Sequence, residues 1–552
     1  TIANTTFRYG GGHYSLYQQY YGAIKNLGGT VTVNNVNFQR GLAGMAQIGG
    51  LTTISNSIIS PDGGSYGFLQ IWGNSIITGN QFVGTSSIPY NIYFQNGTTT
   101  FSDNTFSDTS QGDVYIDANS IFTQSNNKSG TTGGHGIVLS GFLNHDQTLT
   151  SGIPYVIGYL SVFPQNTLTI NPGVVVKFPY GGQMSVLGNL IALGGISTST
   201  KIYFTSISDD VIGGDTNGNG NATLPTAGDY YGIFIQPNAT ATILNSTIRY
   251  GGGGNWSVSS GVVKNLGGAI TLASTKIEKS LEGVIQVGGS TTILNSFISP
   301  DIGSHGFFQA WGESNITGNQ FIGTSSTFYN INFQNGTTTF SGNTFTNANN
   351  GDVSINANAN FTQAGNISLG AGAHGIVFGG ILTHDQVLAS GTPYVISFLN
   401  IQPQKKLTAN PGVILKFSAY SYLDVFGDLR LEGQKSTTTK VYLTSIQNDA
   451  VGGDTNGDGN ATTPAPGDYG GILFEPGSTG EIKNTQIEYG GYGGYPLVAT
   501  LKNNGGRISI TNTKFANNSN GIILNGGTTT ISQSSLIGLP SNSPFFYNNF
   551  TA

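Results

Sequence analysis

Short runs of alternating apolar and polar residues, separated by Gly and Asn, make up most of this chain. In the run "NPGVVVKF", Val174, Val176 and Phe178 fall on one side of an extended strand. Val175 and Lys177 fall on the other side, because successive side chains of a strand point to opposite faces. The pattern predicts strands with one apolar face toward a core and contains little that is typical of a helix.

A six-residue pattern with a bulky apolar residue at each end recurs at short intervals. It ends at Phe38, Ile59, Phe82 and Phe106, so its steps are 21, 23 and 24 residues. A second series ends at Ile277, Ile298, Phe321 and Phe345. Such a step is too short for a propeller blade and has no helical half. We therefore expect each step to be one coil of a β-solenoid, whose strands stack in parallel about 4.8 Å apart.

A longer repeat has a period of about 240 residues. Tyr9, Tyr250 and Tyr489 occupy the same place in the segments "TTFRYGGG", "STIRYGGG" and "TQIEYGGY". This self-similarity divides the chain into two large repeats and a partial third, at 1–241, 242–480 and 481–552. With about 22 residues per coil, a large repeat would extend about 50 Å and the chain somewhat over 100 Å.

The composition agrees with a folded, strand-rich chain. Charged residues make up 8% of the sequence, against roughly 25% in an average globular protein. Apolar residues at 37% are too frequent for a disordered tract. A net charge of -6 without a Lys/Arg cluster argues against nucleic acid as a partner. No stretch approaches the roughly 20 apolar residues of a membrane span, and the lack of Cys excludes disulfides and thiolate metal sites.

A longer signature occurs twice, at about 143–253 and 382–493. It contains "HDQ", then "NPGVVVKF" or "NPGVILKF", and then "GGDTNGNGNAT" or "GGDTNGDGNAT". This run resembles the right-handed parallel β-helix repeats of large prokaryotic extracellular and cell-surface proteins. The resemblance implies an all-β, right-handed parallel β-helix, an elongated rod with loop insertions, at an extracellular or cell-surface location. It implies no single established activity.

The acidic, glycine-rich loop of this signature resembles the first half of a calcium-binding loop. Oxygen-bearing side chains alternate at Asp454, Asn456 and Asp458, and glycines allow the chain to bend around a cation. Ala465 stands where an EF-hand would have its bidentate Glu, so further ligands are needed. We expect a structural calcium site made of Asp449, Asp454, Asn456, Asp458, Asn460 and Asp468. We expect a weaker one made of Asp210, Asp215, Asn217, Asn219 and Asp229. The alternative is a turn-rich loop held by its own backbone, without metal.

Other features raise the question of an enzyme. The segment "GGHG" at 133–136 resembles an element of β-helical pectin hydrolases, and Asp209 with Asp210 resembles their paired acids. Two such carboxyl groups act on a glycosidic bond when they lie about 5 to 9.5 Å apart. The second copy has "AHG" and Asn448 at the equivalent places, which argues against catalysis.

The "HDQ" segments contain a second His–Asp arrangement, at His145 with Asp146 and at His384 with Asp385. Adjacent residues of a strand face opposite ways, so the two side chains would not meet as a base and its orienting acid. A structural histidine is therefore the favoured interpretation. We expect no enzyme, and the alternative is a carbohydrate-active β-helix that binds or cleaves an acidic polysaccharide.

The ends of the sequence show no polar cap of the kind that covers the last coil of a solenoid. We expect either a segment of a longer array or self-association, head to tail or lateral. Exposed aromatic side chains would suit surface glycans as partners. Together these features predict an extracellular structural or adhesive β-solenoid with calcium-stabilised loops, such as a surface rod, a stalk, a layer component or a filament subunit.

Overall fold

The computed structural model describes residues 1–10, 22–62, 66–130, 133–254, 260–303, 305–492, 494, 499–539 and 546–548. These residues form 56 strands and one short 3-10 helix, Thr437–Thr439. The chain divides into two compact units, Thr1–Ile285 and Gln286–Ala552. The division into large repeats at 1–241, 242–480 and 481–552 concerns sequence similarity and stays a prediction.

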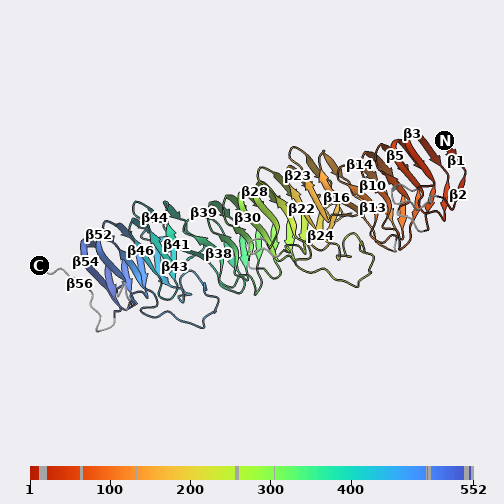
Figure 1. Cartoon of the computed structure of the whole chain (residues 1–552). Helices are drawn as coiled ribbons and strands as arrows, with labels where there is room; N and C mark the ends of the chain where they lie inside the picture. Colours follow the sequence, from red (N-terminus) through yellow and green to blue (C-terminus); the bar gives the residue numbers. More distant parts are fainter. Residues whose placement is uncertain are drawn as a thin grey trace. The chain divides into compact units, whose positions relative to one another are not determined.

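Figure 1 shows the strands of successive coils stacked along the first unit. In its coils between residues 58 and 143, equivalent short strands pair in parallel to form three walls. The first wall contains β7 (Phe68–Gln70), β10 (Tyr90–Phe94), β13 (Gly112–Asp117) and β16 (Ile137–Leu143); the second contains β8 (Asn74–Thr78), β11 (Thr98–Ser102) and β14 (Ile121–Ser125); the third contains β6 (Ile58–Ser60), β9 (Gln81–Val83), β12 (Thr105–Ser107) and β15 (Lys128–Ser129).

The second unit repeats this arrangement. Its walls contain β32 (His305–Gln309), β35 (Tyr329–Phe333), β38 (Gly351–Asn356) and β41 (Ile376–Leu382); β33 (Glu313–Thr317), β36 (Thr337–Ser341) and β39 (Asn360–Ala364); and β34 (Gln320–Ile322), β37 (Thr344–Thr346) and β40 (Ile367–Leu369). The fold is therefore the all-β parallel β-helix that the sequence predicted. Its strand pairing is compatible with right-handed winding, the usual hand of parallel crossovers.

The six-residue pattern predicted the register of the third wall correctly. Phe38 pairs with Ile59, Ile59 with Phe82, and Phe82 with Phe106. The rings of Phe82 and Phe106 stack at 5.4 Å between centroids, and both side chains are buried. Burying one such side chain stabilises the fold by about 1.5–3 kcal/mol. A slip of one residue would turn these rings out of the core, so the stack fixes the register.

The recurrent asparagines have two different roles. Asn56 and Asn126 adopt a positive φ (51° and 54°) at corners, as expected for a residue that tolerates the left-handed region. Asn80, Asn104 and Asn127 are instead buried one above the other. The amide of Asn104 donates to Oδ1 of Asn127 at 3.0 Å, and Asn80 donates to Asn104 in the same way. This ladder satisfies polar groups inside the coil and adds a second constraint on register.

Each large repeat carries one long insertion between strands of adjacent walls. The first lies between β24 (Ile202–Ser206) and β25 (Gly232–Ile235), and the second between β48 (Val441–Ser445) and β49 (Gly471–Phe474). Both appear in Figure 1 as long loops leaving the strands. Each returns to the core through a buried tyrosine: Tyr230 stacks on Phe178 at 4.5 Å, and Tyr469 stacks on Phe417 at 4.4 Å.

Tyr9, Tyr250 and Tyr489, the markers of the long period, share a positive φ of 60°, 66° and 64°. The same bend therefore recurs at the same place of each repeat. None of the helices formed by the described residues has the length and apolar character required to traverse a bilayer.

Candidate functional site

The insertion of each repeat folds back over an earlier coil. In the first unit the backbone N–H of His135 donates to the carbonyl of Thr216 at 3.0 Å. Gly218, at φ +69°, packs directly on Gly133, and a Cβ at Gly218 would lie 2.5 Å from the Gly133 carbonyl carbon. Gly457 makes the equivalent contact in the second unit. Backbone packs on backbone here, so the site requires glycine.

A buried lysine lies beneath each insertion. Lys177 and Lys416 are fully buried, and their ammonium groups donate to the carbonyls of Gly214 and Gly453. Burial lowers the pKa of each lysine to about 8, although nearby aspartates act in the opposite direction. Lys264 in β28 (Gly261–Ala273) donates to Tyr231, and its burial likewise lowers its pKa to about 8.

The alternation in "NPGVVVKF" was predicted correctly. Val174, Val176 and Phe178 are buried in the core, while Val175 is partly exposed. Lys177 is on the outer face, as predicted, but the insertion covers it completely. Periodicity indicates the face of a strand, and it does not reveal that a distant loop covers that face.

Three of the six ligands predicted in the second insertion come together. Carboxylate oxygens of Asp449, Asp454 and Asp458 lie within 4.8 Å of one another. Oδ1 of Asp449, Oδ1 of Asp458 and Oδ1 of Asn456 are buried without a hydrogen-bond partner. Burial and then the charge of Asp454 raise the pKa of Asp449. The cluster therefore concentrates negative charge and leaves oxygens free to accept.

The remaining predicted ligands have other surroundings. Asp468 accepts from the backbone N–H of Ala465 at 3.0 Å, and Asn460 is exposed. Asp454 also accepts from the backbone of Gly457 and Gly459, both at 2.7 Å. The loop thus combines a cluster suited to a cation with the backbone contacts of a self-supporting turn.

The first insertion brings together fewer carboxylates. Asp215 accepts from the backbone of Gly218 and Gly220, at 2.8 and 2.7 Å. Burial and the charge of Asp215 raise the pKa of Asp210. The other predicted ligands have protein partners. Asn217 and Asn219 donate to Thr223 of their own loop, and Asp229 accepts from Thr226 of the loop and from Ser206 at the end of β24. Asn219 stands where the second loop has Asp458, which removes one carboxylate.

The acid pair suggested by the sequence is not a pair of free acids. Asp209 is buried and accepts from Nε of Arg249 at 2.8 Å and from Thr205 at 2.5 Å. The second unit has Asn448 and Glu488 at the equivalent places, and Asn448 donates to Thr444 at 2.8 Å. Both members of the ion pair change together between the two copies. That joint change is a sequence signal for contact, and it was missed.

The "HDQ" residues have structural partners. Asp146 and Asp385 accept from the backbone N–H groups of Thr167 and Lys406 in the next coil, at 2.7 and 2.9 Å. His145 contacts Asn144 at 3.3 Å, and burial lowers its pKa. Nε2 of His145 is buried without a hydrogen-bond partner, so for His145 only the Nδ1 contact supports the structural histidine that the sequence favoured.

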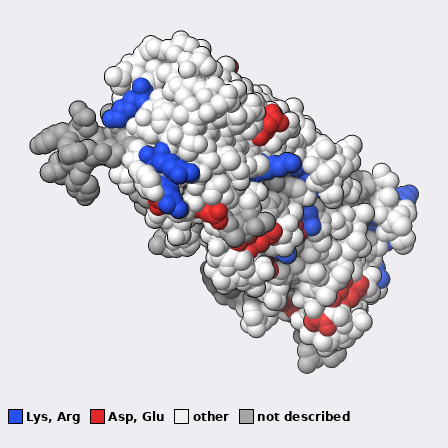
Figure 2. All heavy atoms as spheres, turned by 90° about the vertical axis from the view of Figure 1, so that its right-hand side faces the viewer, with Lys and Arg blue, Asp and Glu red and all other residues white. Residues whose placement is uncertain are grey.

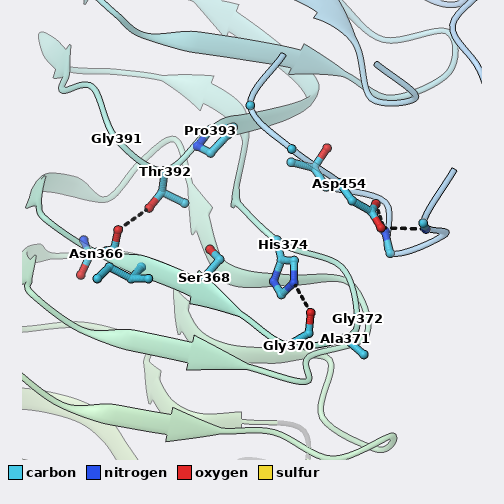
Figure 3. A pocket seen from close by; sticks show the side chains of 16 residues that line it. Asn366, Ser368, Gly370, Ala371, Gly372, His374, Gly391, Thr392, Pro393 and Asp454 are labelled. Atoms are coloured by element: carbon cyan, nitrogen blue, oxygen red, sulfur yellow. Dashed lines mark hydrogen bonds between the residues drawn. The ribbon is translucent and has the colours of Figure 1, made fainter. Parts of the chain in front are cut away.

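A cavity of about 660 Å³ in the first unit is bordered by His135 of the "GGHG" segment. Its lining includes His135, Asp215 and the backbones of Gly213 and Gly214. A cavity of about 640 Å³ occupies the same place in the second unit, where His374 and Asp454 border it (Figure 3). The sequence had not predicted this pair of cavities, because His and Asp come from segments about 80 residues apart.

A buried carboxylate holds the histidine of each cavity. Asp113 accepts from Ser129 at 2.5 Å and from the backbone of Gly136 at 2.9 Å, and it lies 3.5 Å from Nδ1 of His135. Asp352 makes the same contacts in the second unit. The hydrogen bond to the carboxylate raises the pKa of His135. The serine bonds to the aspartate and not to the histidine, so it is not arranged as an activated nucleophile.

The two histidines differ at their other nitrogen. Nε2 of His374 donates to the carbonyl of Gly370 at 3.2 Å (Figure 3). Nε2 of His135 is buried without a partner, and the whole residue is only 7% exposed.

Four half-buried tyrosines cluster on the outer face of the first unit. Tyr93 and Tyr115 stack at 4.5 Å, and Tyr66 and Tyr90 flank them at 4.9 and 5.2 Å. On the face shown in Figure 2, most of the surface belongs to uncharged residues.

Comparison of the chain with protein-family models, curated proteins and solved structures found no match.

Proposed function

We propose that this protein is an extracellular structural or adhesive β-solenoid: a surface rod, a stalk, a layer component or a filament subunit. The proposal is supported by which features the two repeat copies share and which they do not. The coil register, the folded-back insertion and the lysine beneath it recur, at Lys177 and Lys416 for example. The acid pair does not recur, because Asn448 replaces Asp209. A repeated scaffold with an unrepeated acid pair favours a mechanical role over catalysis.

Calcium is the cofactor that suits the second insertion. Asp449, Asp454 and Asp458 supply three negative charges, and Lys416 supplies one positive charge nearby, which leaves a balance of minus two. The partnerless oxygens are carboxylate and amide oxygens, the hard ligands that Ca²⁺ prefers. An ion bound there would fix the insertion to its coil. In the first insertion, Asp210 and Asp215 beside Lys177 give a net charge of minus one, so Ca²⁺ should bind there more weakly.

Hydrogen exchange of the insertion at 446–470, with and without Ca²⁺, tests the metal. At 100 times its dissociation constant, a bound ion stabilises the loop by about 2.7 kcal/mol. Asp458→Asn copies the first insertion and should weaken this protection, while the insertion at 207–231 in the same molecule serves as the control. If millimolar Ca²⁺ leaves exchange at 446–470 unchanged, the calcium proposal is wrong.

Electron microscopy of the purified chain and of the native assembly tests the mechanical role. The proposal expects thin rods of regular width that associate with further copies end to end or side by side. Compact particles that stay single at all concentrations would contradict it.

A further inference from the structure

The paired cavities contain a polar group that the fold itself does not satisfy. His135 is more than nine-tenths buried, and its Nε2 has no partner, although buried polar atoms are nearly always hydrogen-bonded. Asp113, which accepts from Ser129 and from the backbone N–H of Gly136, lies 3.5 Å from Nδ1 and orients the ring. The imidazole is therefore preorganised, with a free nitrogen at a cavity of about 660 Å³. That volume is typical of a small-ligand site.

From this arrangement we propose that the cavity of the first unit binds a neutral saccharide, with Nε2 of His135 and the carboxylate of Asp215 as its hydroxyl partners. The proposal deepens the adhesive role proposed above and rests on it for its biological meaning.

A hydroxyl group is the partner that suits Nε2 in both of its protonation states. With Nδ1 directed at Asp113, Nε2 accepts when the ring is neutral and donates when it is protonated. A hydroxyl can both donate and accept. The lining also contains Lys128, whose positive charge offsets the negative charge of Asp215, so these two side chains give the cavity no net charge. A carboxylate or sulfate suits Nε2 only when the ring is protonated, whereas a polyhydroxylated, uncharged ligand suits it in both states.

The rest of the lining suits a sugar ring. Gly213 and Gly214 present bare backbone to the cavity, which lets a ligand approach closely. Asp113 and Tyr115 are alternate residues of β13, so both side chains point outward, about 6.6 Å apart along the strand. Tyr115 does not line the cavity itself. It is stacked on Tyr93, and together they form a flat amphipathic surface, of the kind that contacts sugar faces, on the same face of β13 as Asp113.

The second unit offers a natural contrast. Its cavity has the same size, but Nε2 of His374 is already bonded to Gly370, and Ser354 and Asn332 stand in the strand positions of Tyr115 and Tyr93. We expect the first cavity to bind with a dissociation constant of about 1 mM, the range of a site with few polar anchors. The second cavity should bind at least tenfold more weakly.

The test uses the full chain with ¹⁵N-labelled histidine, because the sequence has only six histidines. The ligands are neutral trisaccharides of glucose, galactose and mannose, a galacturonate trimer, and sulfate. A saturable shift of the His135 Nε2 signal with at least one neutral trisaccharide, and an unchanged His145 signal, is the expected result. His135→Gln should weaken binding about tenfold or more, whereas His145→Gln should leave it unchanged.

Two results would overturn the proposal. One is the absence of a His135 shift with all three neutral trisaccharides at about 50 mM, far above the expected constant. The other is a shift with sulfate or galacturonate alone, which would make the cavity an anion site. Neither result would change the expected calcium-dependent hydrogen exchange or the expected electron microscopy. The saccharide proposal can therefore be wrong while the proposed structural role stands, and the experiments distinguish the two cases.

Discussion

Removing Arg249 should destabilise the coil that carries the first insertion. Arg249→Ala leaves the carboxylate of Asp209, which is 1% exposed, without its ion-pair partner. Breaking a buried pair in this way costs about 3–5 kcal/mol. We expect the lower end of that range, because Lys177 lies close enough for Asp209 to raise its pKa and therefore compensates in part.

The second unit indicates how the loss can be reversed. There Asn448 occupies the place of Asp209 and donates to Thr444 as an uncharged side chain that needs no ion-pair partner. Adding Asp209→Asn to Arg249→Ala should therefore recover about 2 kcal/mol, leaving a net loss of about 1 kcal/mol.

Hydrogen exchange measures both variants locally. Amides of β24 and of β27 (Ser246–Arg249) should lose protection in the single variant and regain it in the double variant. The equivalent strands β48 and β51 (Thr485–Glu488) should not change, because a solenoid coil interacts mainly with its neighbours. The reasoning is refuted if Arg249→Ala costs less than about 0.5 kcal/mol, or if the double variant is no more stable than the single one.

Three further predictions concern the core and the buried titratable groups. Phe106→Ala should destabilise its coil by about 3–5 kcal/mol in local exchange, with a much smaller effect for the half-exposed Phe142→Ala. In an NMR titration His135, whose pKa is raised, should lose its proton at a higher pH than His145, whose pKa is lowered; the reverse order would contradict the site. Because the Asp113 contact raises the pKa of His135, its stabilisation is complete below pH 6.5 and declines as pH rises through the folded-state pKa. The third prediction concerns the buried lysines Lys177, Lys264 and Lys416, whose pKa is lowered to about 8. Between pH 8 and 10.5 these lysines bind more protons in the unfolded chain than in the native one, so their contribution to stability rises with pH. Denaturation at pH 9 should therefore take up protons, and proton release would contradict the burial of the three lysines.

Local patterns predicted the coils well, because each strand is short and repeats at nearly constant spacing. The stack of Phe82 on Phe106 follows from a six-residue pattern alone. Asparagine was harder, since the same residue type serves corners and a buried ladder, as Asn126 and Asn127 show side by side. Spacing does not distinguish these two roles.

The candidate site could be predicted only in part, because the insertion lies against an earlier coil. Alternating oxygen ligands indicated Asp454 and Asp458 correctly as neighbours. The contact of Thr216 with His135, and the cavity beside it, depend on where a loop of more than twenty residues folds back. No short-range pattern encodes that path. Gly133 and Gly218 are required where the loop packs on the earlier coil, but this requirement can be recognised only once the packing is known.

Disulfide cross-linking tests the in-register stacking of coils most directly, because the chain has no cysteine of its own. Thr100 and Thr123 pair in adjacent coils, and their hydroxyls lie 3.0 Å apart. Stacked coils place these Cα atoms about 4.8 Å apart, within the range of a disulfide, and place Thr100 about 8 Å from Ser125, outside it. The pair Thr100→Cys with Thr123→Cys should therefore oxidise readily, and the pair Thr100→Cys with Ser125→Cys should stay reduced. Equal oxidation of the two pairs, or faster oxidation of the second, would contradict the stacking on which the whole account depends.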